Sequence, residues 1–174
     1  GEVVQVWRPR ELNTHETEWG FSCMGYEISG ALGIKMANPN KEVISFVGDG
    51  SYLLNNTDIY SSVITKNKLI IIVCDNGGFA VINRLQLFKG GNEYNNLLKS
   101  SNTPGLVDVD FAKHAESMGA KSEHVNSISD LEEAFKRAKK SDVTYVISIK
   151  THAYQWLEGS AFWDSPTLEI PTTK

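Results

Sequence analysis

Cysteines are scarce in this 174-residue sequence, and long hydrophobic runs are absent. Its two cysteines, Cys23 and Cys74, show no paired metal-ligand spacing, which argues against a cysteine-based metal site. Cys74 lies in an apolar stretch, where a cysteine usually serves as a small buried hydrophobic residue. No run approaches the ~18 apolar residues that a membrane-spanning helix needs. We therefore expect one soluble, cytoplasmic domain over residues 1–174, with no membrane partner and a core built from its 41% hydrophobic residues.

An excess of basic residues is also missing. The net charge is −4 and the isoelectric point is about 5.6. The 17 Lys and Arg residues are scattered apart from a short run at Lys139 and Lys140, so we expect no nucleic-acid partner. The first ten residues, GEVVQVWRPR, lack an initial methionine, a charged n-region and a long apolar h-region. They do not form a secretory signal, and we expect the chain to be cut from a longer protein.

Short apolar stretches alternate with helical patterns along the chain. Three stretches rich in β-branched and aromatic residues predict buried strands: KEVISFVGDG (41–50), NKLIIIVCDNGG (67–78) and SDVTYVISIK (141–150). Periodicity and capping signals predict helices in MGYEISGALGIKMA (24–37), VDVDFAKHAESMG (107–119) and SISDLEEAFKRAKK (127–140). This alternation predicts a three-layer α/β fold, a parallel sheet with helices on both faces. Residues 88–106, rich in Gly, Asn, Ser and Pro, predict a long surface loop.

Two polar turns follow the first two predicted strands. GDGS (Gly48–Ser51) ends the first strand and CDNGG (74–78) ends the second, and ligands of open parallel sheets gather outside such strand ends. Asp49 offers a carboxylate oxygen and Asn76 an amide oxygen, which are ligand types that Mg²⁺ selects. The neighbouring glycines let backbone N–H groups approach a diphosphate, and a helix that begins near Ser51 favours the same anion. We therefore expect both turns to face one crevice.

A GDG sequence alone is weak evidence, because it often forms only a turn with a helix cap. Asn76, however, follows Asp49 by 27 positions (76 − 49), and this arrangement resembles the thiamin-diphosphate (ThDP) enzymes. The resemblance implies that Asp49, Asn76 and the carbonyl of Gly78 hold magnesium. It further implies cofactor-binding roles for the other residues of the two turns: Gly48, Gly50, Ser51 and Phe79.

A third segment, SCMGYE, supports the same resemblance. Met24 stands 25 positions before Asp49 (49 − 24), where acetohydroxyacid synthase-like members of the family place an apolar residue that wedges between the two cofactor rings. The resemblance then implies that the backbone N–H of Met24 and the carbonyl of Ser22 bind the aminopyrimidine. The alternative is that Met24 is simply the first core residue of its helix.

One position departs from the family pattern. The usual turn has two asparagines, whereas this chain has Asp75 followed by Asn76. The second of the pair is the metal ligand, so the resemblance still implies magnesium binding. Asp75 could instead orient a neighbouring backbone group or cap a turn, and its extra negative charge has no explanation in the sequence.

Four stretches together resemble one branch of the family, the C–C bond-cleaving hydrolases that open the ring of a cyclic dione in inositol catabolism. These stretches are GFSCMGYEISGALGIKMA (20–37), VGDGSYLL (47–54), CDNGGFAVINRLQ (74–86) and WLEGSAFWD (156–164). Three alternatives stay open: a ThDP-dependent 2-oxo acid or semialdehyde decarboxylase or lyase, a diphosphate-binding subunit of a two-chain ThDP oxidoreductase, and a non-enzymatic binding module.

The resemblance covers only the diphosphate-binding domain, so we expect the pyrimidine-binding and central domains of the parent enzyme to be absent from this chain. The pyrimidine-binding domain, from the same or a neighbouring chain, supplies the glutamate that activates the cofactor, and the full-length protein is expected to be a homo-oligomer acting on a small molecule. Glu27 lies on the wrong domain for that duty, so no catalytic residue is assigned here. The four histidines are isolated and are expected to be surface or capping residues: His15, His114, His124 and His152.

Aromatic side chains gather in the C-terminal tail, residues 151–174. They are Tyr154, Trp156, Phe162 and Trp163. They are expected to hold the tail against the core, and a second hypothesis is that the tail closes over the substrate in the complete enzyme.

Overall fold

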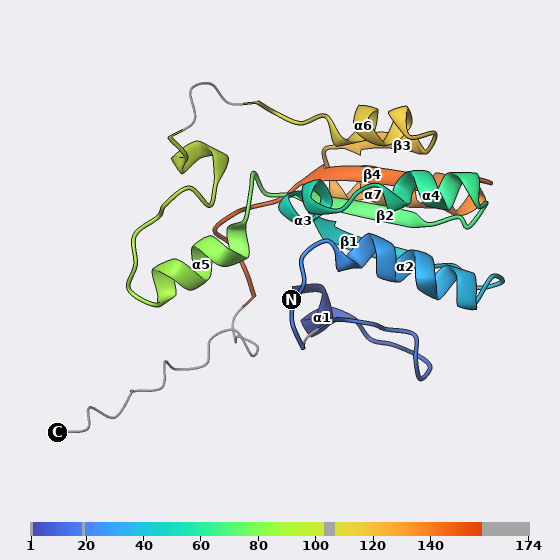
Figure 1. The fold of residues 1–174 in the computed structure, drawn as a ribbon, viewed down its shortest axis with the longest axis horizontal. Coiled ribbons are helices and arrows are strands. Elements are labelled where there is room, and N and C mark those ends of the chain that lie inside the picture. Colours follow the sequence, from blue (N-terminus) through green and yellow to red (C-terminus); the bar gives the residue numbers. More distant parts are fainter. Residues whose placement is uncertain (1, 19, 103–106, 158–174) are drawn as a thin grey trace.

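The computed structural model describes residues 2–18, 20–102 and 107–157, and its centre is a four-stranded parallel sheet (Figure 1). The strands are β1 (Ile44–Gly48), β2 (Ile70–Asp75), β3 (Lys121–Val125) and β4 (Tyr145–Lys150), in the spatial order β1-β2-β4-β3. Gly48 pairs with Cys74, and Asp75 pairs with Lys150. The carboxyl ends of β1, β2 and β4 therefore meet at one edge of the sheet.

Helices connect these strands and cover the sheet. They are α1 (Glu2–Val6), α2 (Tyr26–Ala37), α3 (Asp49–Leu54), α4 (Asp58–Ile64), α5 (Ala80–Phe88), the short 3-10 helix η1 (Leu98–Ser100), α6 (Phe111–Ser117) and α7 (Ile128–Lys140). Within the described ranges, no helix is long and apolar enough to cross a membrane.

Alternate residues of β1, β2 and β4 face two separate hydrophobic cores. Ile71 and Val73 of β2 face a core shared with α2, α3, α4 and α6, whereas Ile70 and Ile72 face a core shared with α7. This alternation follows from the two-residue period of a strand, and it makes both faces of β2 apolar. The prediction of a parallel sheet with helices on both faces is confirmed.

β3 and α5 are among the elements that were not expected from the sequence. β3 has the sequence KSEHV, and as an edge strand it is mostly polar or half-buried, so it shows no apolar run. α5 contributes only Asn83 to the buried residues and lies beside the sheet rather than on it (Figure 1).

The expectation of a surface loop over 88–106 is corrected for its middle part. Leu97 is only 2% exposed and forms an isolated antiparallel bridge with Gly78, and η1 follows it. Residues 95–98, which we call the Leu97 segment, are therefore packed against the turn that ends β2. Residues 103–106 lie outside the described part of the chain.

Candidate functional site

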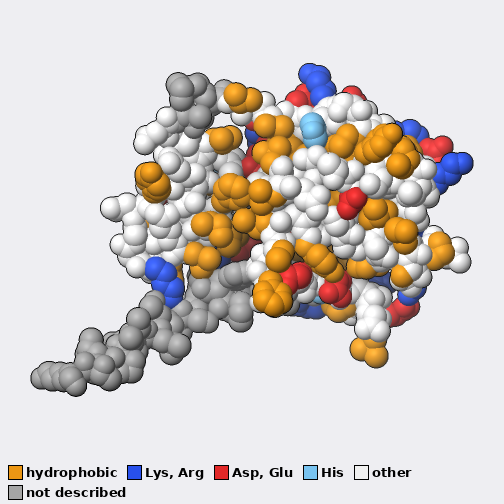
Figure 2. Space-filling view, viewed as in Figure 1, with side chains coloured by type: hydrophobic (Ala, Val, Ile, Leu, Met, Phe, Trp, Pro, Cys, Tyr) orange, Lys and Arg blue, Asp and Glu red, His pale blue; other side chains and the backbone are white. Residues whose placement is uncertain are grey.

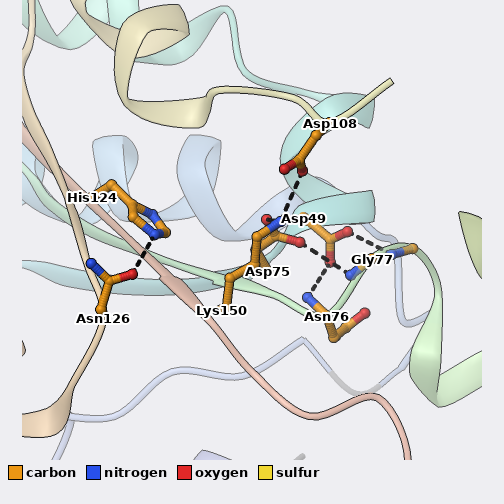
Figure 3. A network of polar contacts seen from close by, with 9 residues as sticks. Asp49, Asp75, Asn76, Gly77, Asp108, His124, Asn126 and Lys150 are labelled. Atoms are coloured by element: carbon orange, nitrogen blue, oxygen red, sulfur yellow. Dashed lines mark hydrogen bonds and ion pairs between the residues drawn. The ribbon is translucent and has the colours of Figure 1, made fainter. Parts of the chain in front are cut away.

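Asp49 and the turn after β2 come together at the carboxyl edge of the sheet. Asp49 is the first residue of α3, directly after β1, so this helix begins two residues before Ser51. The carboxylate accepts hydrogen bonds from two backbone N–H groups, that of Asn76 at 3.2 Å (to Oδ1) and that of Gly78 at 2.6 Å (to Oδ2). The two turns identified in the sequence thus form one unit, which we call the strand-end cradle: residues 48–51 and 75–79 (Figure 3).

The glycines of the cradle are required by its backbone. Gly77 and Gly78 have φ angles of +79° and +140°, which L side chains rarely adopt. Gly78 also lies so close to the Leu97 segment that an added Cβ would be 2.4 Å from the carbonyl oxygen of Asn96. Only glycine lets this turn fold back onto Asp49 while it pairs with the neighbouring loop.

The side-chain amide of Asn76 points at two further oxygens. The end of the amide that faces the cradle lies 3.0 Å from the Gly78 carbonyl oxygen and 3.2 Å from Asp49 Oδ1. With its nitrogen at this end, the amide donates to both oxygens; after a 180° rotation, three oxygens face one another and need a cation between them. Ligands of Mg²⁺ lie about 2.1 Å from the ion in an octahedron, so neighbouring ligand oxygens lie about 3.0 Å apart. The donor set and its spacing therefore fit magnesium.

Asp49 is buried, with 4% exposure, and this environment opposes a negative charge. Burial raises the pKa of its carboxyl, and the nearby charge of Asp75 raises it further, while hydrogen bonds from the Asn76 and Gly78 amides lower it. A bound cation would relieve both unfavourable effects. In the described residues, no three His, Cys, Asp or Glu side chains form a metal cluster, so the site depends on amide and carbonyl oxygens beside Asp49.

Asp75, the residue that departs from the family pattern, has two kinds of partner. Its Oδ1 accepts a hydrogen bond from the Gly77 amide at 3.1 Å, as a turn-capping residue would. Its Oδ2 lies 2.6 Å from the ammonium group of Lys150, which also contacts Asp108 at 2.8 Å (Figure 3). These contacts, first that to Asp108 and then that to Asp75, raise the pKa of Lys150. Lys150 ends the strand next to β2, and no motif in the sequence marked it.

The remaining cradle residues form its walls. The Phe79 ring covers Gly50, where an added Cβ would lie 2.5 Å from the ring atom Cε1. Gly48 faces open space, since a Cβ there would meet no described atom within 4 Å, and Ser51 is half-buried. Beside this wall lies an open cavity of about 480 Å³, lined by residues of the turn and of the Leu97 segment: Gly78, Phe79, Asn95, Asn96, Leu97 and Leu98 among others.

The segment that contains Ser22 and Met24 lies at the start of α2. Gly25, with φ +96°, packs against Asn55 just after α3, and its N–H donates to Glu27 Oε2 at 2.9 Å. Glu27 therefore caps its own turn. Met24 is 45% exposed and Ser22 has a φ of +49°, so the segment presents a free apolar side chain near α3, and its contact with a cofactor stays a prediction.

His114 has a structural role that the sequence did not indicate. Its Nδ1 lies 2.9 Å from the hydroxyl of Tyr52, a side chain of α3 that is fully buried and whose pKa is raised by burial. His124 contacts Asn126 and His15 contacts Thr17 on the surface. These three histidines thus have partners outside the cradle, and the Nδ1 of the fourth, His152, accepts a hydrogen bond from the Tyr154 N–H at 3.4 Å.

Comparisons with known proteins agree with this geometry. Residues 1–149 match the family model of the thiamine pyrophosphate enzyme, C-terminal TPP binding domain. The chain is 40% identical over its full length to 3D-(3,5/4)-trihydroxycyclohexane-1,2-dione hydrolase of Shouchella clausii, and 37% identical over 94% of its length to the protein of that name from Bacillus subtilis. It spans 27% and 25% of those relatives, about a quarter of their length.

A solved structure is similar to the same part of the chain. The thiamine diphosphate-dependent 4-hydroxybenzoylformate decarboxylase of Rhodococcus jostii RHA1 superposes with a TM-score of 0.66 at 28% identity, over 74% of this chain and 23% of that one. The sheet and its helices therefore have the fold of a thiamine diphosphate-binding domain.

Proposed function

Because the chain belongs to the thiamine pyrophosphate enzymes, as their C-terminal TPP-binding domain, we propose that it provides the magnesium–diphosphate site of a ring-opening C–C hydrolase. The proposed substrate is a trihydroxycyclohexane-1,2-dione of inositol catabolism, as the names of the relatives indicate. The observation that carries the proposal is the convergence of Asp49, the Asn76 amide and the Gly78 carbonyl at the strand ends.

The residues of the cradle have distinct proposed roles. Asp49, Asn76 and the carbonyl of Gly78 would hold Mg²⁺, and the open space at Gly48 would let the diphosphate approach the backbone. Phe79 fixes one wall by packing on Gly50. The cofactor-binding set is completed by three residues at the edges of the site: Ser22, Met24 and Ser51.

The cofactor and this chain divide the chemistry. Thiamin diphosphate, when bound, would supply a nucleophilic carbon for addition to a carbonyl group of the substrate and an electron sink for the C–C bond that breaks. The residues of this chain bind and orient the cofactor, and Asp49 keeps its carboxylate fixed through the two amide hydrogen bonds. In the proposed hydrolysis, the hydroxyl group of water would end on the carbonyl carbon that leaves as a carboxylic acid, and the proton would go to the carbon whose bond to it is broken.

The rest of the active site is proposed to come from a pyrimidine-binding domain, of the same or a neighbouring chain in a homo-oligomer, which supplies the activating glutamate. Hydrophobic side chains are exposed on α5, next to the cradle: Val81, Ile82 and Phe88 are 49%, 40% and 60% exposed (Figure 2). Such a surface is suited to contact with another domain. A cytoplasmic location belongs to the same proposal, because both cysteines are free thiols.

Asp49→Asn in the full-length protein tests the metal site. The variant keeps the size of the side chain but removes the charge, so we expect magnesium-dependent ThDP affinity, measured by calorimetry, to fall at least about 100-fold. Asp58→Asn is the matched control, because Asp58 also begins a short helix, α4, away from the cradle. Unchanged ThDP affinity in Asp49→Asn would contradict the proposed site.

Turnover assays distinguish the proposed reaction from the reactions of other ThDP-dependent enzymes. Full-length protein loaded with Mg²⁺ and ThDP is expected to open the ring of the trihydroxy-dione. The assay measures the loss of the cyclic substrate and the appearance of a carboxylic acid. Carbon dioxide release from a 2-oxo acid, without ring opening, would instead identify a decarboxylase.

A further inference from the structure

We propose that Lys150 is a positioning residue that neutralises Asp75, so that the cradle favours a metal-bound diphosphate over a bare cation. The proposal rests on the cofactor site proposed above and concerns the charge that this site presents to the anion. It also explains how the chain tolerates a carboxylate where the family pattern has an amide.

Two buried carboxylates lie next to each other at the strand ends. Asp49 and Asp75 are each 4% exposed, and Asp49 accepts a hydrogen bond from the residue that follows Asp75. Their mutual repulsion is one reason why the pKa of Asp49 is raised. A second uncompensated negative charge here would attract a divalent cation but repel a diphosphate.

Lys150 is placed by the sheet to cancel this charge. It is the register partner of Asp75 on β4, and its Nζ lies 2.6 Å from Asp75 Oδ2. Its second partner, Asp108, is 80% exposed, so water and salt screen that charge. The Lys150–Asp75 pair thus makes the inner position electrically neutral and leaves Asp49 as the one uncompensated carboxylate of the cradle.

The turn itself does not depend on the lysine. The side-chain Oδ1 of Asp75 accepts a hydrogen bond from Gly77 N–H, and its backbone carbonyl accepts one from Thr151 N–H at 2.7 Å. Both bonds remain when the ammonium group is removed. Loss of Lys150 should therefore change the charge of the cradle more than its shape, and this separates an electrostatic role from a purely structural one.

The test uses Lys150→Met in the full-length protein, with two separate readouts. Binding of Mn²⁺ alone is followed by electron paramagnetic resonance, and binding of ThDP at saturating Mg²⁺ is followed by calorimetry. We expect the affinity for Mn²⁺ alone to rise and that for ThDP to fall, each by about tenfold, since a bare carboxylate then faces both ligands. Opposite shifts in one variant are not produced by a merely loosened turn, which weakens both.

A second variant and a control complete the experiment. Asp75→Asn combined with Lys150→Met removes both charges while the amide oxygen can still accept from Gly77, so both affinities should return close to the original values. The control is Lys121→Met: Lys121 forms a 2.9 Å ion pair with Asp142, is 56% exposed as against 53% for Lys150, and lies at the amino end of β3. It should change neither affinity.

Parallel weakening of Mn²⁺ and ThDP binding in Lys150→Met, or no change in either, would overturn the proposal. So would a double variant that stays as impaired as the single one. Failure of the cofactor site itself is recognised separately, because Asp49→Asn would then leave both affinities unchanged.

Discussion

Gly78→Ala is the substitution for which the structure gives the sharpest expectation. The new methyl group would lie 2.4 Å from the Asn96 carbonyl oxygen and 3.1 Å from Leu97 Cα, and both are backbone atoms that cannot rotate away. The φ of +140° is also strained for any residue with a Cβ. The turn and the Leu97 segment must therefore separate.

The expected loss of stability follows from the backbone strain and from the hydrogen bonds that break when the turn and the Leu97 segment separate. Backbone strain at such a φ costs about 1–3 kcal/mol. Two hydrogen bonds join the segments, Phe79 N–H to Asn96 O at 2.7 Å and Leu98 N–H to Gly77 O at 2.9 Å. Each contributes about 1 kcal/mol. We expect Gly78→Ala to lower the free energy of unfolding by about 3–5 kcal/mol in total.

Two alanine substitutions serve as controls in the same urea denaturation series. Gly77→Ala retains positive φ strain but meets no described atom within 4 Å, so a loss of about 1 kcal/mol is expected. Gly33→Ala in α2 also has open space and should be neutral or stabilising by up to about 1 kcal/mol. The Gly78 variant should in addition lose magnesium-dependent ThDP affinity, because its carbonyl moves. Stability equal to Gly77→Ala together with full cofactor affinity would refute the reasoning.

Three further outcomes are expected. Glu123→Gln should lower stability by up to about 1 kcal/mol at pH 7, a value limited by the partial exposure of the Arg137 pair. The hydrogen bond from Arg137 lowers the pKa of Glu123 below its ordinary 4.5, so the stabilisation is present above that value, and in urea titrations at several pH values the difference should vanish as pH falls through the lowered pKa. Ile71→Ala, in a fully buried site, should cost about 2–5 kcal/mol by urea denaturation, while Ile64→Ala, 58% exposed, should stay within about 0.5 kcal/mol. The 174-residue chain alone should show no turnover with ThDP, Mg²⁺ and the cyclic dione, because the activating glutamate is proposed to lie on another domain; turnover would disprove that placement.

The strands that carry the site could be predicted because they are buried on both faces. β1, β2 and β4 are short apolar runs, and in a parallel sheet their carboxyl ends share one edge. This shared edge is enough to predict that Asp49 and Asn76 lie close together. β3 could not be found in this way, because KSEHV buries only Val125 fully and carries no apolar run.

The position of the loop after α5 was harder to predict, since it depends on one tertiary contact. Its Gly, Asn and Ser residues favour a surface loop, yet Leu97 packs at 2% exposure and its backbone pairs with Gly78. Nothing local distinguishes Leu97 from its neighbour Leu98, which is 42% exposed. The contact arises because the two positive-φ glycines of the cradle leave room for a second backbone.

The partner of Asp75 could not be predicted from the sequence for a related reason. Lys150 is 75 positions away (150 − 75), and only the β2–β4 register, which pairs Asp75 with Lys150, brings the two together. From the sequence, Asp75 is an unexplained negative charge beside a proposed anion site; in the fold, it is half of an ion pair. Under the proposal for Lys150, we expect a carboxylate at this position to be compatible with diphosphate binding only where the neighbouring strand ends in a cation. The charges of Asp75 and Lys150 should therefore be removed together rather than one at a time. For this reason the double variant, and neither single substitution, is expected to keep the original balance of metal and cofactor affinity.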